Sequence, residues 1–199
     1  MSEQSSFFAV VSRMKYIERW ALMRNARPEN LSEHSLEVAV IAHALATIGN
    51  VRHGRKLNAD RAALIGLFHD TTEIVTGDMP TPVKYANGTI RDAYKDVEDQ
   101  AAHRLLSGLP EDLRPTYEAI YFGADDEDDA YLRKLVKAAD RISALIKCVD
   151  ERQSGNREFW RAEQGCRSKV EQMAATCPEV RDFMDEFLPS YGETLDELL

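Results

Sequence analysis

Residues 62–73 read AALIGLFHDTTE, and this stretch decides both the expected fold class and the place to look for a site. Four of its apolar residues recur at the spacing of one helical face: Ala62, Ala63, Ile65 and Phe68. We therefore expect a helix from Asn58, as its N-cap, to about Val75. His69 and Asp70 interrupt the apolar face, although polar side chains are rare inside a core unless they are paired or bind a metal.

Similar helical spacing recurs along most of the chain, and no segment alternates with period two for long enough to form a strand. We therefore expect an all-α fold. Further helices are expected over residues 5–20, 32–48, 90–105, 110–122 and 132–146, with two or three more after residue 155. Two prolines in GDMPTP, residues 77–82, predict a rigid loop. Since no repeat or long linker divides the chain, residues 1–199 are expected to form a single domain.

Composition limits the classes of partner. The chain has 25 Lys and Arg against 34 Asp and Glu, a formal charge of −9, which disfavours general binding to a nucleic-acid polymer. No apolar run approaches the roughly 18 residues that cross a bilayer, and the first residues do not resemble a signal peptide. The three cysteines are odd in number and have no motif spacing, which favours a reducing compartment. We expect a cytoplasmic protein without a membrane partner.

The acidic residues 125–129, DDEDD, are expected to form a solvated linker and the negative first turn of the next helix.

Two further polar residues accompany the His69-Asp70 doublet. His34 lies in the first turn of one expected helix, and Asp140 follows the apolar residues of a later one. Two imidazoles and two carboxylates make a plausible four-ligand set for a divalent transition metal. The alternatives are that His34 is an ordinary surface or core residue and that Asp140 pairs with Arg141 or with Arg133.

The order of these residues, a His, then an adjacent His-Asp pair, then a distant Asp, resembles the HD-domain metal-dependent phosphohydrolases. Other segments resemble, more narrowly, the bacterial HD-domain 5′-deoxynucleotidase family: Arg19-Trp20, SEHS at 32–35, Glu73, GDMPTPVK at 77–84 and LVKAAD at 135–140. The resemblance covers nearly the whole chain. Thr71 and Thr72 depart from the smaller residues expected there, which concerns packing and not the ligands.

This resemblance implies an HD-type helical bundle and an activity. The expected enzyme hydrolyses deoxyribonucleoside 5′-monophosphates to deoxynucleosides and phosphate, and forms a homodimer. The four family ligand positions match His34, His69, Asp70 and Asp140, which would bind one divalent transition-metal ion, cobalt, manganese or similar. The other three histidines have no such neighbours and are interpreted as structural, so a single ion is expected.

Candidate acids and bases follow the doublet. Glu73 comes four residues after His69 and three after Asp70, so helix geometry would place it on the side of the ligands. Asp78 lies in the loop just beyond. One of these carboxylates is expected to act as the general acid or base, as the resemblance also suggests, but the sequence does not decide which. Without the family, Glu73 could equally be an exposed helical carboxylate.

Substrate-binding residues are implied by the resemblance alone. Arg19 would contact the phosphate, and Trp20 would pack against the sugar where a ribose 2′-hydroxyl needs room. The alternative is a surface charge at Arg19 and a core anchor at Trp20. Lys84 is a weaker candidate for the phosphate, and Thr81 would help to hold the loop or the substrate.

Two other functions stay open at this point. The chain could hydrolyse another nucleotide, such as a deoxynucleoside triphosphate or a signalling nucleotide, or it could be a non-catalytic nucleotide-binding module.

Overall fold

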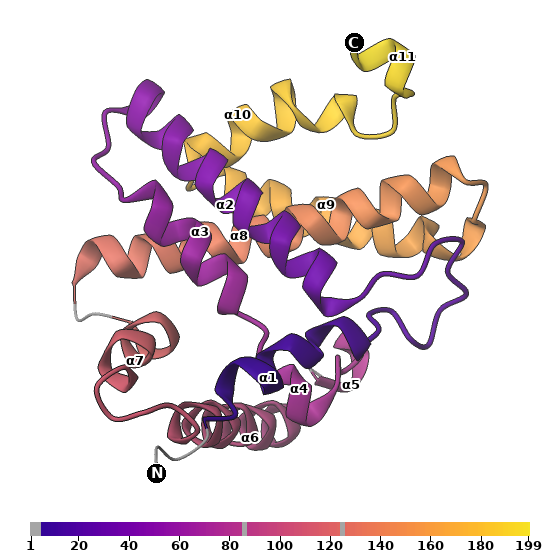
Figure 1. The fold of residues 1–199 in the computed structure, drawn as a ribbon. Coiled ribbons are helices and arrows are strands. Elements are labelled where there is room, and N and C mark those ends of the chain that lie inside the picture. Colours follow the sequence, from indigo (N-terminus) through magenta and orange to yellow (C-terminus); the bar gives the residue numbers. More distant parts are fainter. Residues whose placement is uncertain (1–4, 85–86, 124–125) are drawn as a thin grey trace. The chain divides into compact units, whose positions relative to one another are not determined.

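The computed structural model describes residues 5–84, 87–123 and 126–199, and Figure 1 draws them as a succession of helices. Within these ranges there is no β-strand, and the only strand-like pairing is an isolated antiparallel bridge between Glu18 and Asn30. The expected all-α fold is therefore confirmed. None of the described helices is long and apolar enough to cross a membrane.

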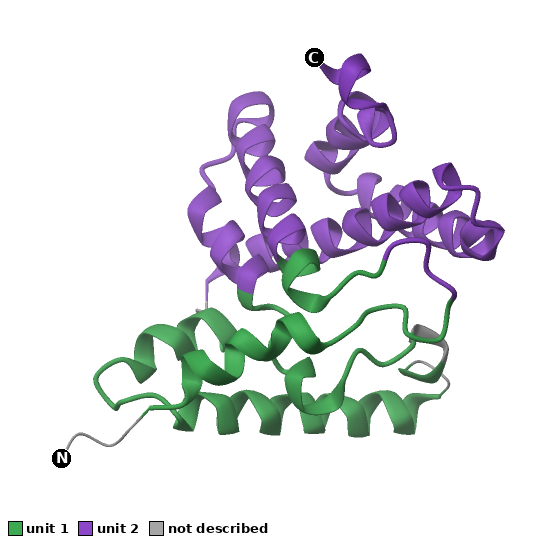
Figure 2. Cartoon of the chain, turned by 45° about the vertical axis from the view of Figure 1, so that its right-hand side comes forward, with its two compact units in different colours: residues 1–23, 28–35, 68–124 green, residues 24–27, 36–67, 125–199 purple. Residues whose placement is uncertain are grey.

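Two compact units make up the chain, each assembled from separate stretches of sequence (Figure 2). The first comprises residues 1–23, 28–35 and 68–124, and the second comprises residues 24–27, 36–67 and 125–199. Helix α2, Leu31–His53, begins in the first unit and continues in the second, past its expected end at Ile48. That these units form one domain stays a prediction.

The first unit has a small apolar core. Besides the start of α2 it contains these helices: α1 (Phe7–Val11), η1 (Ser12–Tyr16), α4 (Glu73–Thr76), α5 (Thr81–Lys84), α6 (Gly88–Ser107) and α7 (Arg114–Phe122). Four residues form its buried cluster: Phe7, Leu105, Leu106 and Leu109. The ring of Tyr117 packs edge-on against Phe7, with the centroids 5.1 Å apart. The apolar residues of this unit thus come mainly from α1, α6 and α7.

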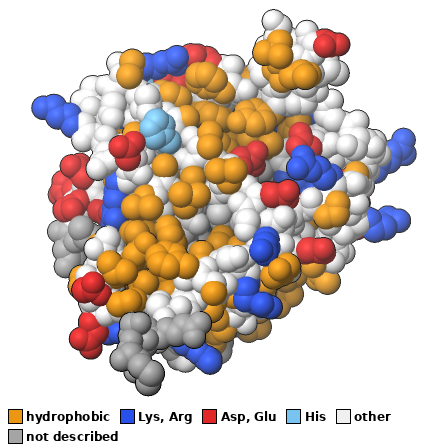
Figure 3. All heavy atoms as spheres, viewed as in Figure 1, with side chains coloured by type: hydrophobic (Ala, Val, Ile, Leu, Met, Phe, Trp, Pro, Cys, Tyr) orange, Lys and Arg blue, Asp and Glu red, His pale blue; other side chains and the backbone are white. Residues whose placement is uncertain are grey.

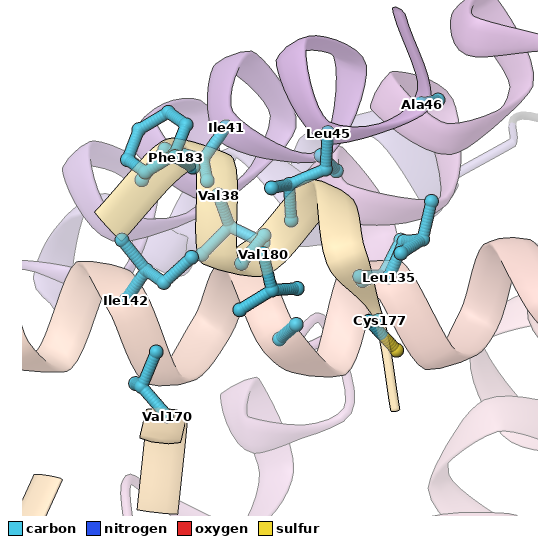
Figure 4. Packing of buried hydrophobic residues seen from close by; sticks show 14 of the residues in the cluster. Val38, Ile41, Leu45, Ala46, Leu135, Ile142, Val170, Cys177, Val180 and Phe183 are labelled. Atoms are coloured by element: carbon cyan, nitrogen blue, oxygen red, sulfur yellow. The ribbon is translucent and has the colours of Figure 1, made fainter. Parts of the chain in front are cut away.

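A larger core fills the second unit. It contains most of α2 and α3 (Ala59–Phe68), and then α8 (Glu127–Gln153), η2 (Arg157–Phe159), α9 (Trp160–Ala174), α10 (Pro178–Glu186), η3 (Leu188–Ser190) and α11 (Leu195–Leu198). Figure 4 shows Val38 of α2 directed toward Val180 of α10. Helix α3 can approach α2 because residue 66 is glycine: a Cβ there would lie 2.9 Å from Cα of Ala39. Burial of this apolar surface is the main stabilising contribution in the unit.

The first expected helix ends earlier than predicted. Helices α1 and η1 stop at Tyr16, so Arg19 and Trp20 lie beyond the helix and not at its last turn. Ile17 is extended, and its carbonyl oxygen accepts a hydrogen bond from the N–H of Leu31 at 2.9 Å. This pairing draws the chain alongside the start of α2 and ends the helix.

The helix expected over residues 58–75 is interrupted. Helix α3 ends at Phe68, a turn covers residues 69–72, and α4 begins at Glu73. The hydroxyl of Thr71 donates to the carbonyl oxygen of Phe68 at 2.8 Å, a local bond that competes with the helical pattern. The His-Asp doublet therefore lies in a turn between two helices.

The acidic residues 127–129 form the negative first turn of α8, as expected, and Asp126 and Asp129 also make specific contacts. The side chain of Asp126 caps α8 by accepting the N–H of Asp129 at 2.6 Å. Asp129 is itself buried and accepts hydrogen bonds from Arg61 at 3.0 Å and from Arg133 at 2.8 Å. This carboxylate therefore joins α3 to α8 inside the second unit, whereas Asp125 falls outside the described residues.

Candidate active site

Two segments of the first unit bring histidine and aspartate side chains together. His34 lies in the first turn of α2 and is fully buried, and His69 and Asp70 come from the turn after α3. Their ligand atoms all lie within 4.8 Å of one another. Oδ2 of Asp70 is 3.0 Å from Nε2 of His69 and 3.5 Å from Nε2 of His34. The structure thus brings together three of the four side chains that the sequence predicts as metal ligands.

This donor set suits a metal ion. Burial acts to raise the pKa of Asp70, but the rings of His69 and His34 outweigh it and hold the pKa well below its ordinary value of 3.8. Asp70 is therefore ionised at neutral pH. A carboxylate oxygen beside two imidazole nitrogens is the kind of mixed oxygen and nitrogen set that binds divalent transition metals. The residues present fit such an ion.

The fourth predicted ligand belongs to the second unit. Asp140 lies within α8 and is partly buried. Nε of Arg141 is 3.9 Å from its Oδ2, while Arg133 pairs with Asp129. Of the two alternative partners considered for Asp140, Arg141 lies within ion-pair distance, and the role of Asp140 as a ligand stays a prediction.

Arg19 is buried, with 8% of its surface exposed, so the alternative of an ordinary surface charge is wrong. Its Nη1 is 3.6 Å from Oδ2 of Asp70, and its Nε donates to Oε2 of Glu29 at 3.3 Å. A guanidinium in this position presents a fixed cation beside the predicted metal ligands. Such a group can bind the oxygens of a phosphate.

Trp20 has an unusual backbone conformation. Its φ of 57° lies in the left-handed region, which costs a residue other than glycine about 1 to 3 kcal/mol. Its backbone N–H donates to Oδ2 of Asp78 at 3.2 Å, and its carbonyl oxygen accepts from the N–H of Met23 at 2.8 Å. The indole Nε1 donates to Glu29 at 3.1 Å. The ring is thus oriented by a hydrogen bond.

Glu73 is buried, so the alternative of an exposed helical carboxylate is wrong. It is the first residue of α4, with 6% of its surface exposed, and its Oε2 has no hydrogen-bond partner among the described residues. Burial raises the pKa of Glu73 to about 9, and the negative charges of Asp70 and Asp78 add to the effect. Because α3 ends before Glu73, the position of Glu73 is set by α4 and not by a continuous α3. A carboxyl group that keeps its proton at neutral pH can act as a general acid.

The remaining predicted residues lie in the segment after α4. Asp78 is partly exposed in the loop, where its carboxylate accepts a hydrogen bond from the backbone N–H of Trp20. Nζ of Lys84 donates to Oε1 of Glu98 at 2.8 Å. Burial acts to lower the pKa of Lys84, but this bond outweighs it and raises the pKa. Thr81 opens α5, and its side chain lies outside the described part of the chain.

Glu29 is the residue of this site that the sequence analysis missed. It follows Pro28 in the segment between two expected helices, and nothing in its local pattern distinguishes it from a solvated carboxylate. Its importance is visible only once the chain at residues 17–19 pairs with residues 29–31. A contact of that kind leaves no periodic signal in sequence.

Comparison with known proteins identifies relatives along nearly the whole chain. The profile of the 5′-deoxynucleotidase YfbR-like family matches residues 6–191. The 5′-deoxynucleotidase YfbR of Escherichia coli is 44% identical over 196 residues, which cover 98% of this chain and 96% of the relative.

Solved structures show the same fold at lower sequence identity. An HD-domain phosphohydrolase of Listeria innocua superposes with a TM-score of 0.80 at 24% identity, covering 94% of this chain and 88% of the other. An HD phosphohydrolase of cyanophage S-2L, whose structure contains dA and one catalytic Zn²⁺ ion, gives a TM-score of 0.60 at 20% identity, covering 94% and 96%. These likenesses confirm the expected HD-type helical fold.

Proposed function

The chain belongs to the YfbR-like 5′-deoxynucleotidase family, and we propose that the side chains around Asp70 in the first unit carry out its reaction. The protein is a phosphomonoesterase that hydrolyses deoxyribonucleoside 5′-monophosphates to deoxynucleosides and phosphate. The observation that carries the assignment to these residues is the cluster of His34, His69 and Asp70 beside the buried Arg19 and Glu73.

One divalent transition-metal ion is assigned to this cluster, with His34, His69 and Asp70 as ligands and Asp140 as the fourth. The single Zn²⁺ ion of the cyanophage neighbour supports one ion per chain, while cobalt, manganese, iron or nickel suit the same donors. When bound, the ion polarises a phosphate oxygen and lowers the pKa of a water molecule.

Arg19 binds the phosphate of the substrate. Its guanidinium is fixed at Nε by Glu29 and lies 3.6 Å from Asp70, so a phosphate at the metal site would meet a preformed cation. Lys84 and Thr81 on α5 are assigned a weaker role in the same binding step. Because Lys84 is already paired with Glu98, its contribution to binding is expected to be smaller than that of Arg19.

Glu73 supplies the proton that the reaction needs. When the bond between phosphorus and the 5′-oxygen breaks, the alkoxide is a poor leaving group unless it is protonated. The pKa of about 9 keeps a proton on Glu73 at neutral pH, which favours it over Asp78 as the general acid. Asp78 instead holds the backbone of Trp20, whose indole packs against the deoxyribose and leaves no room for a 2′-hydroxyl.

A homodimer and a cytoplasmic location complete the proposal. Helix α2 leaves Leu36, Val40 and Val51 exposed on one of its faces, a surface that a second copy could cover. Figure 3 shows hydrophobic side chains reaching the surface between charged ones on the face drawn in Figure 1. Light scattering of the purified protein measures the oligomeric state directly.

Metal removal tests the function. Purified protein is treated with a chelator, dialysed, and assayed for orthophosphate released from a panel of deoxyribo- and ribonucleoside 5′-monophosphates. We expect release from the deoxyribonucleotides to stop and to return when Co²⁺ or Mn²⁺ is added. Release that continues unchanged without metal would contradict the proposal, as would release of pyrophosphate when a deoxynucleoside triphosphate is included in the panel.

A further inference from the structure

Glu29 contacts two of the residues to which substrate binding is assigned, Arg19 and Trp20. Its Oε2 accepts hydrogen bonds from Nε of Arg19 at 3.3 Å and from Nε1 of Trp20 at 3.1 Å. Its side chain is 13% exposed, so water competes little for these contacts. A single carboxylate oxygen therefore links the cation that binds phosphate to the ring that packs against the sugar.

The backbone of Glu29 is tied to the same dipeptide. The N–H of Arg19 donates to the carbonyl oxygen of Glu29 at 2.9 Å, next to the bridge between Glu18 and Asn30. Both the main chain and the side chain of Glu29 thus hold Arg19, while the side chain alone holds Trp20. Because the same oxygen accepts both hydrogen bonds, movement of Oε2 away from the indole N–H would also weaken its bond to the buried guanidinium of Arg19. Loss of such a bond is costly at low exposure.

We propose that Glu29 is a positioning residue that fixes the indole of Trp20 and the guanidinium of Arg19, and thereby sets the preference for deoxyribose over ribose. This inference rests on the proposed function. An indole has one N–H, and a hydrogen bond there restricts rotation of the ring about its side-chain torsions. The ring then stays where a 2′-hydroxyl would collide with it. A guanidinium held at Nε keeps a fixed orientation in which it can bind the phosphate.

The predicted metal ligand His34 lies at the limit of ion-pair distance from Glu29. The other oxygen of Glu29, Oε1, lies 4.0 Å from Nδ1 of His34, which is beyond hydrogen-bond distance. Removal of the carboxylate should therefore change substrate selection and leave the metal content of the protein unchanged.

Steady-state kinetics on matched variants test the proposal. Glu29→Ala removes the carboxylate, Glu29→Gln keeps its size and one acceptor oxygen, and Glu18→Gln changes an exposed glutamate in the same pairing. We compare kcat/KM for a deoxyribonucleoside 5′-monophosphate with that for its ribonucleotide counterpart. The ratio should fall about tenfold or more in Glu29→Ala and less in Glu29→Gln, and should match the wild type in Glu18→Gln.

Fluorescence gives a readout that does not depend on turnover. The chain has two tryptophans, so in a Trp160→Phe background the emission comes from Trp20 alone. Quenching of this emission by acrylamide should increase in Glu29→Ala, because the ring gains freedom.

A double-mutant comparison tests the hydrogen bond itself. Phenylalanine has no N–H, so in a Trp20→Phe background the effect of Glu29→Gln on the ratio of the two kcat/KM values should shrink. If Glu29→Ala does not fold, Glu29→Gln replaces it in both the kinetic and the quenching comparisons.

Two results would overturn the proposal. One is an equal loss of activity on both substrates with unchanged quenching, which would make Glu29 a stabilising residue only. The other is a parallel loss of bound metal, which would place its effect at His34. If the wild type releases no phosphate from either substrate, the proposed function fails. The quenching comparison then still tests the positioning role of Glu29. Equal quenching with and without Glu29→Ala in the Trp160→Phe background would overturn that role.

Discussion

Two buried glutamates, Glu73 in the first unit and Glu151 in the second, have opposite electrostatic surroundings. In the second unit the carboxylate of Glu151 accepts from Nζ of Lys147, from the N–H groups of Ala26 and Arg27, and from the side chain of Asn156. Burial acts to raise the pKa of Glu151, but these bonds outweigh it and lower the pKa to about 2. In the first unit, by contrast, burial and two nearby aspartates raise the pKa of Glu73 to about 9.

The comparison distinguishes a buried carboxylate that stabilises the fold, Glu151, from one to which a catalytic role is assigned, Glu73. Glu151 belongs to a network that ties residues 24–27 to α8 in a unit with a large apolar core. Glu73 has a buried oxygen without a partner among the described residues, in a unit whose apolar cluster is small. Buried polar groups left without such partners cost stability and occur where function requires them. Glu73 therefore costs stability at a position beside the predicted metal ligands, whereas Glu151 contributes stability.

The largest effect is expected from the loss of a proposed metal ligand in the first unit. Asp70→Asn should reduce kcat by about a thousandfold or more and should lower the metal content, since the ionised oxygen of the cluster is removed. The matched change in the second unit, Asp129→Asn, removes a carboxylate paired with Arg61 and Arg133 and should leave kcat unchanged at a temperature where it is folded. Equal loss of activity in both variants would break the comparison.

Glu73→Gln should lower kcat about a hundredfold or more, because an amide cannot supply the proton.

The same change should stabilise the metal-free protein at alkaline pH. Since the folded pKa of about 9 lies above the ordinary 4.5, ionisation favours the unfolded state, and stability falls as the pH rises from 4.5 toward 9. Urea unfolding with chelator at pH 5 and pH 8.5 should show this fall in the wild type and not in Glu73→Gln.

Glu151→Gln should have the opposite profile, with a loss of stability and no change in kcat. Its folded pKa of about 2 lies below the ordinary 4.5, so its ionised form stabilises the protein above pH 4.5. That contribution, at most about 3 kcal/mol for a shift of this size, is lost as the pH falls from 4.5 toward 2. Denaturant unfolding at pH 6 and pH 3 measures it. A variant as stable as the wild type at pH 6 would contradict the account.

Trp20→Ala should have the smallest of these effects. Removing the ring opens room for a 2′-hydroxyl, so the preference for deoxyribo- over ribonucleotides should fall about 5- to 150-fold. Competition between the two nucleotides for one enzyme preparation measures the ratio. An unchanged preference would show that the indole is not what excludes ribose.

Local patterns predicted most of the helices and the residues of the metal cluster. The apolar spacing before Phe68 correctly placed α3, and the order of His34, His69 and Asp70 correctly indicated residues that meet in space. The break after Phe68 depends on the hydroxyl of Thr71, and two adjacent threonines were the available signal for it.

Contacts between distant residues could not be predicted. The early end of the first helix depends on Ile17 pairing with Leu31, and the role of Glu29 depends on that same pairing. Asp129 was correctly expected in the acidic start of α8, but its burial could not be predicted, because its partner Arg61 is 68 residues away. Hydrophobic periodicity reports which side of one helix is buried, but not which polar groups meet across the fold.

Anomalous diffraction from crystals grown with Co²⁺ or Mn²⁺ tests the central claim most directly. The account predicts one strong peak per chain, about 2.0 to 2.3 Å from an imidazole nitrogen of His34, an imidazole nitrogen of His69 and carboxylate oxygens of Asp70 and Asp140. A peak bound to other residues, or none at this cluster in protein that releases phosphate from deoxynucleotides, would contradict it.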